Sequence, residues 1–274
     1  MVYDLHNDLL TADADVKAVL GGYTTDAVKG IILVVWTSLK TPSEKQLCDI
    51  HIPLSELDLR VAIEDLGSVR CENADYSRLL EKIHPAYVSL TWNGENVLGG
   101  GCGYEAPISS KGRLAVRQLV RFGIPLDLSH LSDKAFYSAL DEADRTGVRI
   151  LVTHTASRAL SLHPRNITDD MVREVVARGG IIGVAAVPNF LDDKLVYGEN
   201  CGLERYADHI EHLCSVAGAD SVAIGSDFFG TDYLPSGLQT YRDFVGLASE
   251  LSERGFTETD TEKIFYGNAE KFMR

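Results

Sequence analysis

The sequence has few cysteines and no cysteine pattern. Its five cysteines are scattered, odd in number and never spaced as Cys-x-x-Cys. That usage argues against a disulfide framework or a structural zinc site and favours reduced thiols. We therefore expect a cytoplasmic protein.

Basic residues and long apolar runs are also scarce. Lys and Arg number 26 against 40 Asp and Glu, which gives a formal net charge of −14. A field of that sign repels phosphate backbones and anionic lipids, so nucleic acids and membrane surfaces are poor candidate partners. No run approaches the roughly 18 apolar residues of a membrane span, and the sequence from Val2 onward is strand-like and lacks a signal-peptide pattern.

What the chain does have is a regular succession of short apolar runs rich in β-formers. They are continuous rather than alternating, as expected of parallel strands covered on both faces. Amphipathic, helix-favouring sequence fills most gaps, with Ser132 and Thr168 as expected N-caps and Gly147 and Gly179 as expected stops. The runs are 2–8, 30–37, 60–66, 86–92, 124–130, 149–154, 181–187 and 221–227, and the clearest helical segments are 111–123, 132–147, 168–179, 203–217, 236–254 and 259–272.

Strand–helix alternation of this kind predicts an α/β fold, a single (β/α)8 TIM barrel over residues 1–274. The length suits one such barrel, which typically takes about 250 residues. Active sites of these barrels lie at the carboxyl ends of the strands.

Metal-ligand residue types stand at the downstream ends of five of the runs. His-x-Asp at the first puts two ligands on one face of a strand, and His, Asp and Glu are the ligands of a catalytic zinc site. The residues are His6, Asp8, Glu64, His130, His154 and Asp227. The pattern predicts a metal-dependent hydrolase.

Some of these residues have a second interpretation. Glu64 could bridge two metals or form an ion pair with Arg60 or Arg70. Asp227 could bind metal, move protons or cap the next turn. His209 and His212 lie on a predicted outer helix, where packing or surface roles are favoured, and His51, His84 and His163 receive no role. Gly99-Gly100-Gly101 is not followed by Gly-Lys-Ser/Thr and is expected to be a flexible loop.

At these same residues the sequence resembles the membrane (renal) dipeptidase family of binuclear zinc peptidases. The resemblance spans nearly the whole chain and rests on an ordered set of motifs. They are DLHND, GIILVVWTS, IED, LTWNGENVLGGG, GIPLDLSHLS, THTASRAL, HPRNITDDM, VARGGIIGV, AGADSVAIGSDF and YGNAEKF.

The resemblance implies a role for each matched residue. His6 and Asp8 would bind one Zn2+, His130 and His154 a second, and Glu64 would bridge the two together with a water or hydroxide. Asp227 matches the family's acid near that water, and Arg165 matches its substrate-anchoring arginine. The implied activity is hydrolysis of dipeptides, including those with a D-residue at the C-terminal position, by the zinc-bridging hydroxide, and the implied assembly is a homodimer.

Three departures from the family pattern concern the substrate pocket. Trp92 replaces a histidine that steadies the developing oxyanion in relatives of the mammalian enzyme, and indole can only donate one N–H. Phe229 replaces the second acid of GSDFDG. The segment between Asp8 and Glu64 is short, and the loop around Pro188 and Asn189 differs.

Two other functions stay open at this point. One is a related binuclear amidohydrolase acting on a non-peptide amide, lactam or ester, although His-x-Asp with Glu64 argues against the barrels that open with His-x-His. The other is a non-catalytic barrel used as a binding module, which the complete set of ligand residues argues against.

Overall fold

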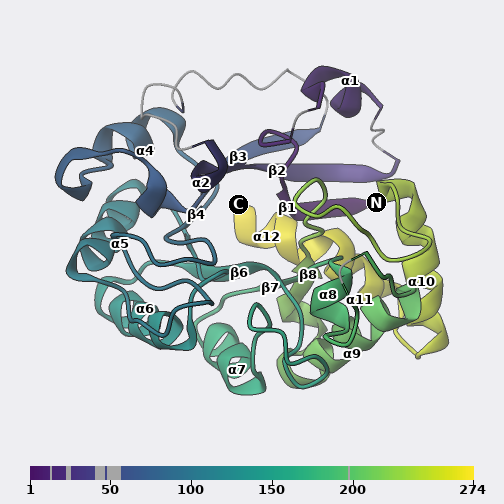
Figure 1. Cartoon of the computed structure of the whole chain (residues 1–274). Helices are drawn as coiled ribbons and strands as arrows, with labels where there is room; N and C mark the ends of the chain where they lie inside the picture. Colours follow the sequence, from purple (N-terminus) through teal and green to yellow (C-terminus); the bar gives the residue numbers. More distant parts are fainter. Residues whose placement is uncertain (13, 23–25, 41–46, 48–56, 197) are drawn as a thin grey trace. The chain divides into compact units, whose positions relative to one another are not determined.

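The computed structural model describes the chain except residues 13, 23–25, 41–46, 48–56 and 197 (Figure 1). The prediction for His51 falls outside the described residues. The strands are parallel and follow one another in chain order in a closed barrel, which is the predicted (β/α)8 fold. They are β1 (Val2–Asn7), β2 (Val28–Trp36), β3 (Asp58–Glu64), β4 (Val88–Ser89), β5 (Leu126–Asp127), β6 (Ile150–Thr155), β7 (Ile182–Val184) and β8 (Val222–Ile224).

The predicted segments 111–123, 132–147, 168–179 and 203–217 match helices within a few residues, whereas 236–254 is α-helical only over Phe244–Glu253 and 259–272 is divided into three short helical pieces. The described helices of four or more residues are α1 (Val16–Gly21), α2 (Thr37–Lys40), α4 (Ser77–Ile83), α5 (Ser110–Phe122), α6 (Asp133–Thr146), α7 (Asp169–Ala177), α8 (Pro188–Leu191), α9 (Leu203–Ala217), α10 (Phe244–Glu253), α11 (Glu258–Glu262) and α12 (Asn268–Met273), with a π-helical turn η5 (Lys263–Gly267). Ser132 and Thr168 cap α6 and α7 as predicted, each accepting a bond from a backbone N–H of the first turn. Gly147 ends α6 with φ 73°.

The apolar runs overstate the length of several strands. The run 124–130 becomes a strand of two residues, and 86–92 likewise. After β5 the chain bends at once, and His130 has a left-handed backbone with φ 69°. Burial keeps these stretches apolar whether or not their backbone pairs, so hydrophobicity alone cannot mark the strand end.

Two compact units make up the chain, and each is described by itself. Unit 1 comprises Met1–Ile32, Ser55–Leu59 and Val152–Arg274. Within it β1 pairs with β8, β8 with β7 and β7 with β6. Helices α9 and α10 pack side by side in this unit (Figure 1). The prediction of a single domain over 1–274 stays a prediction.

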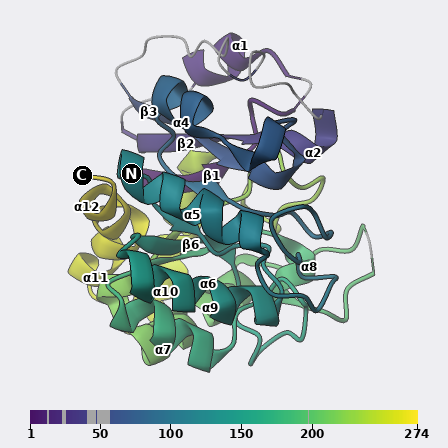
Figure 2. The same ribbon diagram turned by 90° about the vertical axis from the view of Figure 1, so that its left-hand side faces the viewer.

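Unit 2 comprises Leu33–Leu54 and Arg60–Leu151. Within it β3 pairs with β4, β4 with β5, and β5 with the start of β6. Helices α5 and α6 run side by side (Figure 2), and Glu142 of α6, fully buried, accepts hydrogen bonds from Arg113 and Arg117 of α5. This ion-pair cluster joins the two helices that flank β5.

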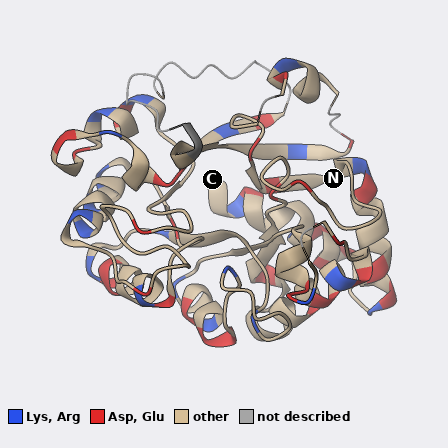
Figure 3. Cartoon of the chain, in the orientation of Figure 1, with Lys and Arg blue, Asp and Glu red and all other residues tan. Residues whose placement is uncertain are grey.

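Charged side chains are distributed unevenly between strands and helices. Figure 3 shows Lys, Arg, Asp and Glu mainly on helices and connecting segments, whereas β1, β6, β7 and β8 are buried along their whole length. Across the described part of the chain, no helix has both the length and the apolar character needed to cross a bilayer.

Candidate functional site

Strand β1 of unit 1 carries three polar residues on one face. Asp4, His6 and Asp8 alternate along the strand and its end, and all three are buried. His6 Nε2 lies 3.2 Å from Asp8 Oδ2. The predicted pairing of His6 and Asp8 as neighbouring ligand-type side chains is therefore present.

Asp227 reaches the same point from β8. Its backbone N–H donates to the carbonyl of His6 (3.0 Å), and its Oδ1 lies 3.9 Å from His6 Nε2. Its backbone is left-handed, with φ 62°. Gly230 makes the approach possible, since a Cβ there would lie 2.2 Å from Asp227 Oδ1 and 2.5 Å from Asp8 Oδ2. His6, Asp8 and Asp227 each offer a ligand atom within 4.8 Å of the others.

His154 joins this cluster from β6. Its ring centroid lies 3.7 Å from that of His6, and the Thr153 hydroxyl contacts Nδ1 of both rings, at 2.8 Å for His154 and 3.4 Å for His6. The β6–β7 register shifts between Val152 and Thr155, an irregularity of the kind that re-aims side chains near active sites. We call His6, Asp8, His154 and Asp227 the β1–β6–β8 group.

Asp4 supports the β1–β6–β8 group from within the strand. Its carboxylate accepts hydrogen bonds from the backbone N–H of His6 and Ser226 and from the hydroxyls of Ser226 and Tyr241. Burial raises the pKa of Asp4 above its ordinary value, although all four donors act in the opposite direction. The carboxyl group thus ties β1, which bears His6, to the segment that bears Asp227.

Arg165 is fastened to the strand that bears His154. Its Nη2 donates to the His154 carbonyl (3.2 Å), and its own carbonyl accepts from the Thr155 hydroxyl (2.9 Å). The side chain is buried, and its guanidinium carbon lies 5.3 Å from the centroid of the Phe190 ring. Sequence reasoning from the residues alone would have placed this arginine on the surface.

Unit 2 supplies the other two candidate ligands, which we call the β3–β5 group. Glu64 ends β3 and His130 follows β5, and His130 Nε2 lies 2.8 Å from Glu64 Oε1. Both side chains are buried. The Glu64 carboxylate therefore faces the His130 imidazole.

Trp92 lies beside this group. Its ring centroid is 6.1 Å from that of His130 and 4.6 Å from that of Trp36. Its neighbour Asn93 accepts a hydrogen bond from His130 Nδ1 at 2.8 Å. Asn93, like Thr153 and Asp4, was not singled out from the sequence.

The donor chemistry of both groups fits divalent zinc. Imidazole nitrogen and carboxylate oxygen are its ligands in catalytic sites. The four β1–β6–β8 residues and the two β3–β5 residues are all buried, and carboxylates in such surroundings need a cation or strong donors nearby.

His209 and His212 have partners outside these two groups. His209 is fully buried on α9, where its Nδ1 accepts from the Ser157 N–H (2.9 Å) and its Nε2 donates to the Leu191 carbonyl (2.8 Å). Burial lowers its pKa to about 4. His212 pairs with Asp169 at 2.8 Å. Both thus have the packing and surface roles expected of them.

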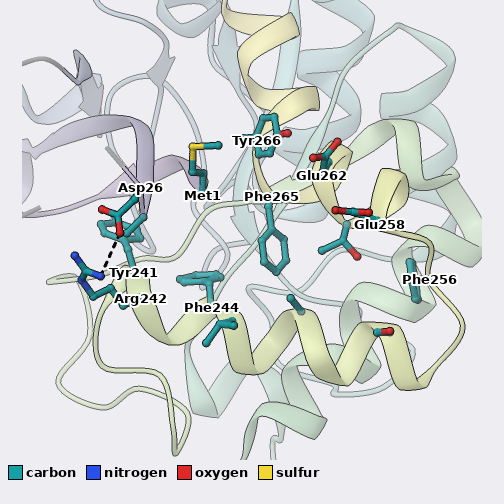
Figure 4. Close-up of a pocket in the computed structure, with 15 residues that line it drawn as sticks. Met1, Asp26, Tyr241, Arg242, Phe244, Phe256, Glu258, Glu262, Phe265 and Tyr266 are labelled. Atoms are coloured by element: carbon teal, nitrogen blue, oxygen red, sulfur yellow. Dashed lines mark hydrogen bonds and ion pairs between the residues drawn. The ribbon is translucent and has the colours of Figure 1, made fainter. Parts of the chain in front are cut away.

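A separate cavity lies in unit 1 (Figure 4). It measures about 570 Å³ and is lined by Met1 at the start of β1, by Phe244 and Val245 of α10 and by Phe265 and Tyr266 of η5. No candidate ligand lines it. We assign it no part in the chemistry.

The fold and the residues at its strand ends define a class, the parallel-barrel metallohydrolases. Residues 62–274 match the family model described as membrane dipeptidase (peptidase family M19). The chain belongs to this family, which confirms the resemblance drawn from the motifs.

Two curated relatives are similar over part of their length. Dipeptidase tcpJ of Claviceps purpurea is 30% identical over 201 residues, covering 72% of this chain and 46% of that protein. An uncharacterized dipeptidase, C3A11.10c of Schizosaccharomyces pombe, is 30% identical over 183 residues, covering 65% and 43%. The chain thus spans about half the length of these relatives.

Solved structures support the fold over nearly the whole chain. A Rhodobacter sphaeroides metallopeptidase, liganded with a phosphinate mimic of the dipeptide L-Ala-D-Ala, matches with a TM-score of 0.80 at 19% identity, covering 99% of this chain and 98% of its own. A second structure, of a metallopeptidase called dipeptidase AC, also matches with a TM-score of 0.80 at 19% identity, covering 99% and 97%. At such identity the likeness concerns the fold.

Proposed function

We propose that this chain is a zinc-dependent dipeptidase, which hydrolyses the peptide bond of dipeptides with two zinc ions. The observation that carries the proposal is the set of His, Asp and Glu residues that close the parallel strands of a chain belonging to the dipeptidase family. Such strand ends are where parallel barrels carry their active sites.

The proposal assigns His6 and Asp8 to one ion and His130 and His154 to the other, with Glu64 binding both. Its support within unit 1 is the approach of His6 and Asp8 to 3.2 Å. Its support within unit 2 is the 2.8 Å contact of Glu64 with His130. When bound, the metals would supply Lewis-acid polarisation of the substrate carbonyl and a water that is nucleophilic at neutral pH.

Asp227 is assigned to proton transfer. Its carboxylate lies 3.9 Å from His6 Nε2. The backbone of Asp227 is left-handed, with φ 62°. It would accept the proton of the attacking water and deliver it to the departing amine, as a general base and then a general acid.

Arg165 is assigned to the substrate's C-terminal carboxylate. A guanidinium can grip a carboxylate with two parallel hydrogen bonds. Its tether to the His154 carbonyl puts it beside a candidate ligand. A clamp of this kind would restrict the enzyme to short peptides. Tolerance of a D-residue at the C-terminal position is part of the proposal, since the Rhodobacter sphaeroides protein binds a mimic of L-Ala-D-Ala.

Trp92 is assigned to the substrate pocket beside His130. Its N–H can donate to a developing oxyanion but cannot carry charge. Together with Phe229, it would alter substrate preference relative to family members that have polar side chains there. We also propose a cytoplasmic location and a homodimer.

The deciding experiment combines metal analysis with a panel of L,L- and L,D-dipeptides, cyclic amides and esters, assayed with and without chelator. About two zinc ions per chain and chelator-sensitive dipeptide cleavage would support the proposal. Two metals with cleavage of only amides or esters would favour the related amidohydrolase. A protein that binds no zinc after supplementation and cleaves nothing would favour the binding module.

A further inference from the structure

Asn93 touches His130 at the nitrogen opposite to Glu64. His130 Nδ1 lies 2.8 Å from Asn93 Oδ1, while His130 Nε2 lies 2.8 Å from Glu64 Oε1. An amide oxygen can only accept, so the imidazole must carry its proton on Nδ1 to make this bond. Nε2, the nitrogen 2.8 Å from the Glu64 carboxylate, is then left to bind a cation shared with that carboxylate, because a bare lone pair would repel the carboxylate oxygen.

A second contact involves the same amide oxygen. The Cys102 thiol donates to Asn93 Oδ1 at 3.2 Å. The oxygen thus accepts from both the thiol and the imidazole.

The three consecutive glycines explain how Asn93 and Cys102 come to flank His130. A Cβ on Gly101 would lie 1.9 Å from the Trp92 carbonyl oxygen, so only glycine permits this close approach. The Cys102 N–H then donates to the His130 carbonyl at 2.7 Å. The expected flexible loop is thus a tightly hydrogen-bonded turn that holds His130 by both its backbone and its ring.

The Asn93 side chain is not what closes this turn. Backbone bonds do so, from Gly103 N–H to the Asn93 carbonyl and from Gly101 N–H to the Gly94 carbonyl. The side chain that supports the turn is that of Asn96, whose Oδ1 accepts from the N–H groups of Leu98 and Gly99. Asn96 therefore stabilises the turn, whereas the Asn93 side chain contacts His130.

We propose that Asn93 is a positioning residue, which holds His130 in the Nδ1–H tautomer so that Nε2 binds the metal. The inference rests on the proposed function, because it takes His130 as a ligand. Hydrogen-bond partners of metal-binding histidines fix the tautomer and ring orientation, and their loss typically costs about 10- to 100-fold in metal affinity.

The first test needs no activity. Long-range 1H–15N spectra of zinc-loaded protein at pH 8, with the His130 signals assigned by their absence in His130→Gln, report which ring nitrogen carries the proton and how fast that proton exchanges with solvent. We expect a slowly exchanging Nδ1–H in the wild type and in Asn93→Asp, and a faster-exchanging Nδ1–H or an Nε2–H ring in Asn93→Leu. An Nε2–H ring in the wild type, or an unchanged Nδ1–H in Asn93→Leu, would overturn the inference. The wild-type spectrum decides even if Asn93→Leu fails to fold.

The second test is zinc affinity by competition with a chelator. Asn93→Leu should weaken one of the two zinc equivalents about 10- to 100-fold, whereas Asn93→Asp, which keeps the acceptor, should restore it. Cys102→Ser keeps a donor to Oδ1 and is the matched control. Wild-type protein that binds no zinc would refute the proposed function. Wild-type binding that Asn93→Leu leaves unchanged would refute only the role of Asn93.

Discussion

The two groups of candidate ligands are held in place by different means. Strand backbone and a buried carboxylate hold the β1–β6–β8 group, in which Asp4 accepts from the N–H of His6 and Ser226. In the β3–β5 group, the turn between β4 and α5 holds His130 through Asn93 and the N–H of Cys102. Ligands on paired strands inherit their positions from the fold, whereas a ligand in a bend needs side chains of its own to orient it.

The first prediction removes one ligand from each group. Asp8→Ala and His130→Ala should each lower kcat/KM for dipeptides by about 10⁴-fold, because a catalytic metal supplies several kcal/mol of charge stabilisation and the nucleophile. Metal analysis of both variants should show about one zinc ion lost. His212→Ala is the control, since His212 pairs with Asp169 on the outer helices.

A retained activity in either variant would break the comparison at once. Full activity of His130→Ala with loss in Asp8→Ala would mean that the β1–β6–β8 group alone performs the chemistry. Glu64 and His130 would then be a structural pair.

The second prediction separates ligation from proton transfer within the β1–β6–β8 group. Asp227→Asn should lower kcat by about 10²- to 10⁴-fold, the usual contribution of a general acid–base residue. Its zinc content should stay at the wild-type level. A loss of zinc together with kcat would instead make Asp227 a ligand, the interpretation that its 3.9 Å approach to His6 also permits.

The sequence predicts the residues at strand ends better than the residues of the turn that holds His130. The ligand-type residues stand out because each ends an apolar run, and period-two alternation already puts His6 and Asp8 on one face. Asn93 gives no such signal, since its partner His130 is 37 residues away. The triple glycine was visible, but the close approach that requires it depends on how the turn folds back on Trp92.

The fold itself was predictable because alternating runs and caps repeat along the chain. Strand lengths were not, since burial keeps a bend as apolar as a strand. Arg165 illustrates a further gap, because its burial depends on the tether to the His154 carbonyl, which no local pattern announces.

The third prediction tests the substrate clamp. Arg165→Ala should raise KM for dipeptides about 10- to 100-fold, since a hydrogen bond to a charged group contributes about 1.5–3 kcal/mol, and should change kcat less. Arg178→Ala is the control, because its guanidinium pairs with Glu174 of α7. An unchanged KM in Arg165→Ala would make the assignment wrong.

The smallest effect concerns stability, where the supports of the two units also differ. In unit 1, His209 of α9 accepts a hydrogen bond from the Ser157 N–H, and burial lowers the pKa of this imidazole to about 4. In unit 2, burial raises the pKa of Glu142, but hydrogen bonds from Arg113 and Arg117 outweigh this, so its pKa lies below the usual value. Acid should therefore weaken the two supports in different pH windows.

For His209 the unfolded chain takes up a proton near pH 6.5, whereas the folded chain does so only near pH 4. The contribution of neutral His209 to the free energy of unfolding is fully present above pH 6.5. It falls as the pH drops toward 4, by about 3 kcal/mol in all. Glu142 contributes above its unfolded value of 4.5 and loses that contribution as the pH falls through its lower folded value. Denaturant unfolding of metal-free protein at pH 8 to 4 gives the free energy of unfolding as a function of pH. This free energy should fall less steeply with pH in His209→Gln than in the wild type. Glu142→Gln should lower the free energy of unfolding while leaving its pH dependence between pH 6.5 and 5 unchanged. The same pH dependence in His209→Gln as in the wild type would mean that the His209 imidazole of the wild type can be protonated in the folded protein without loss of stability.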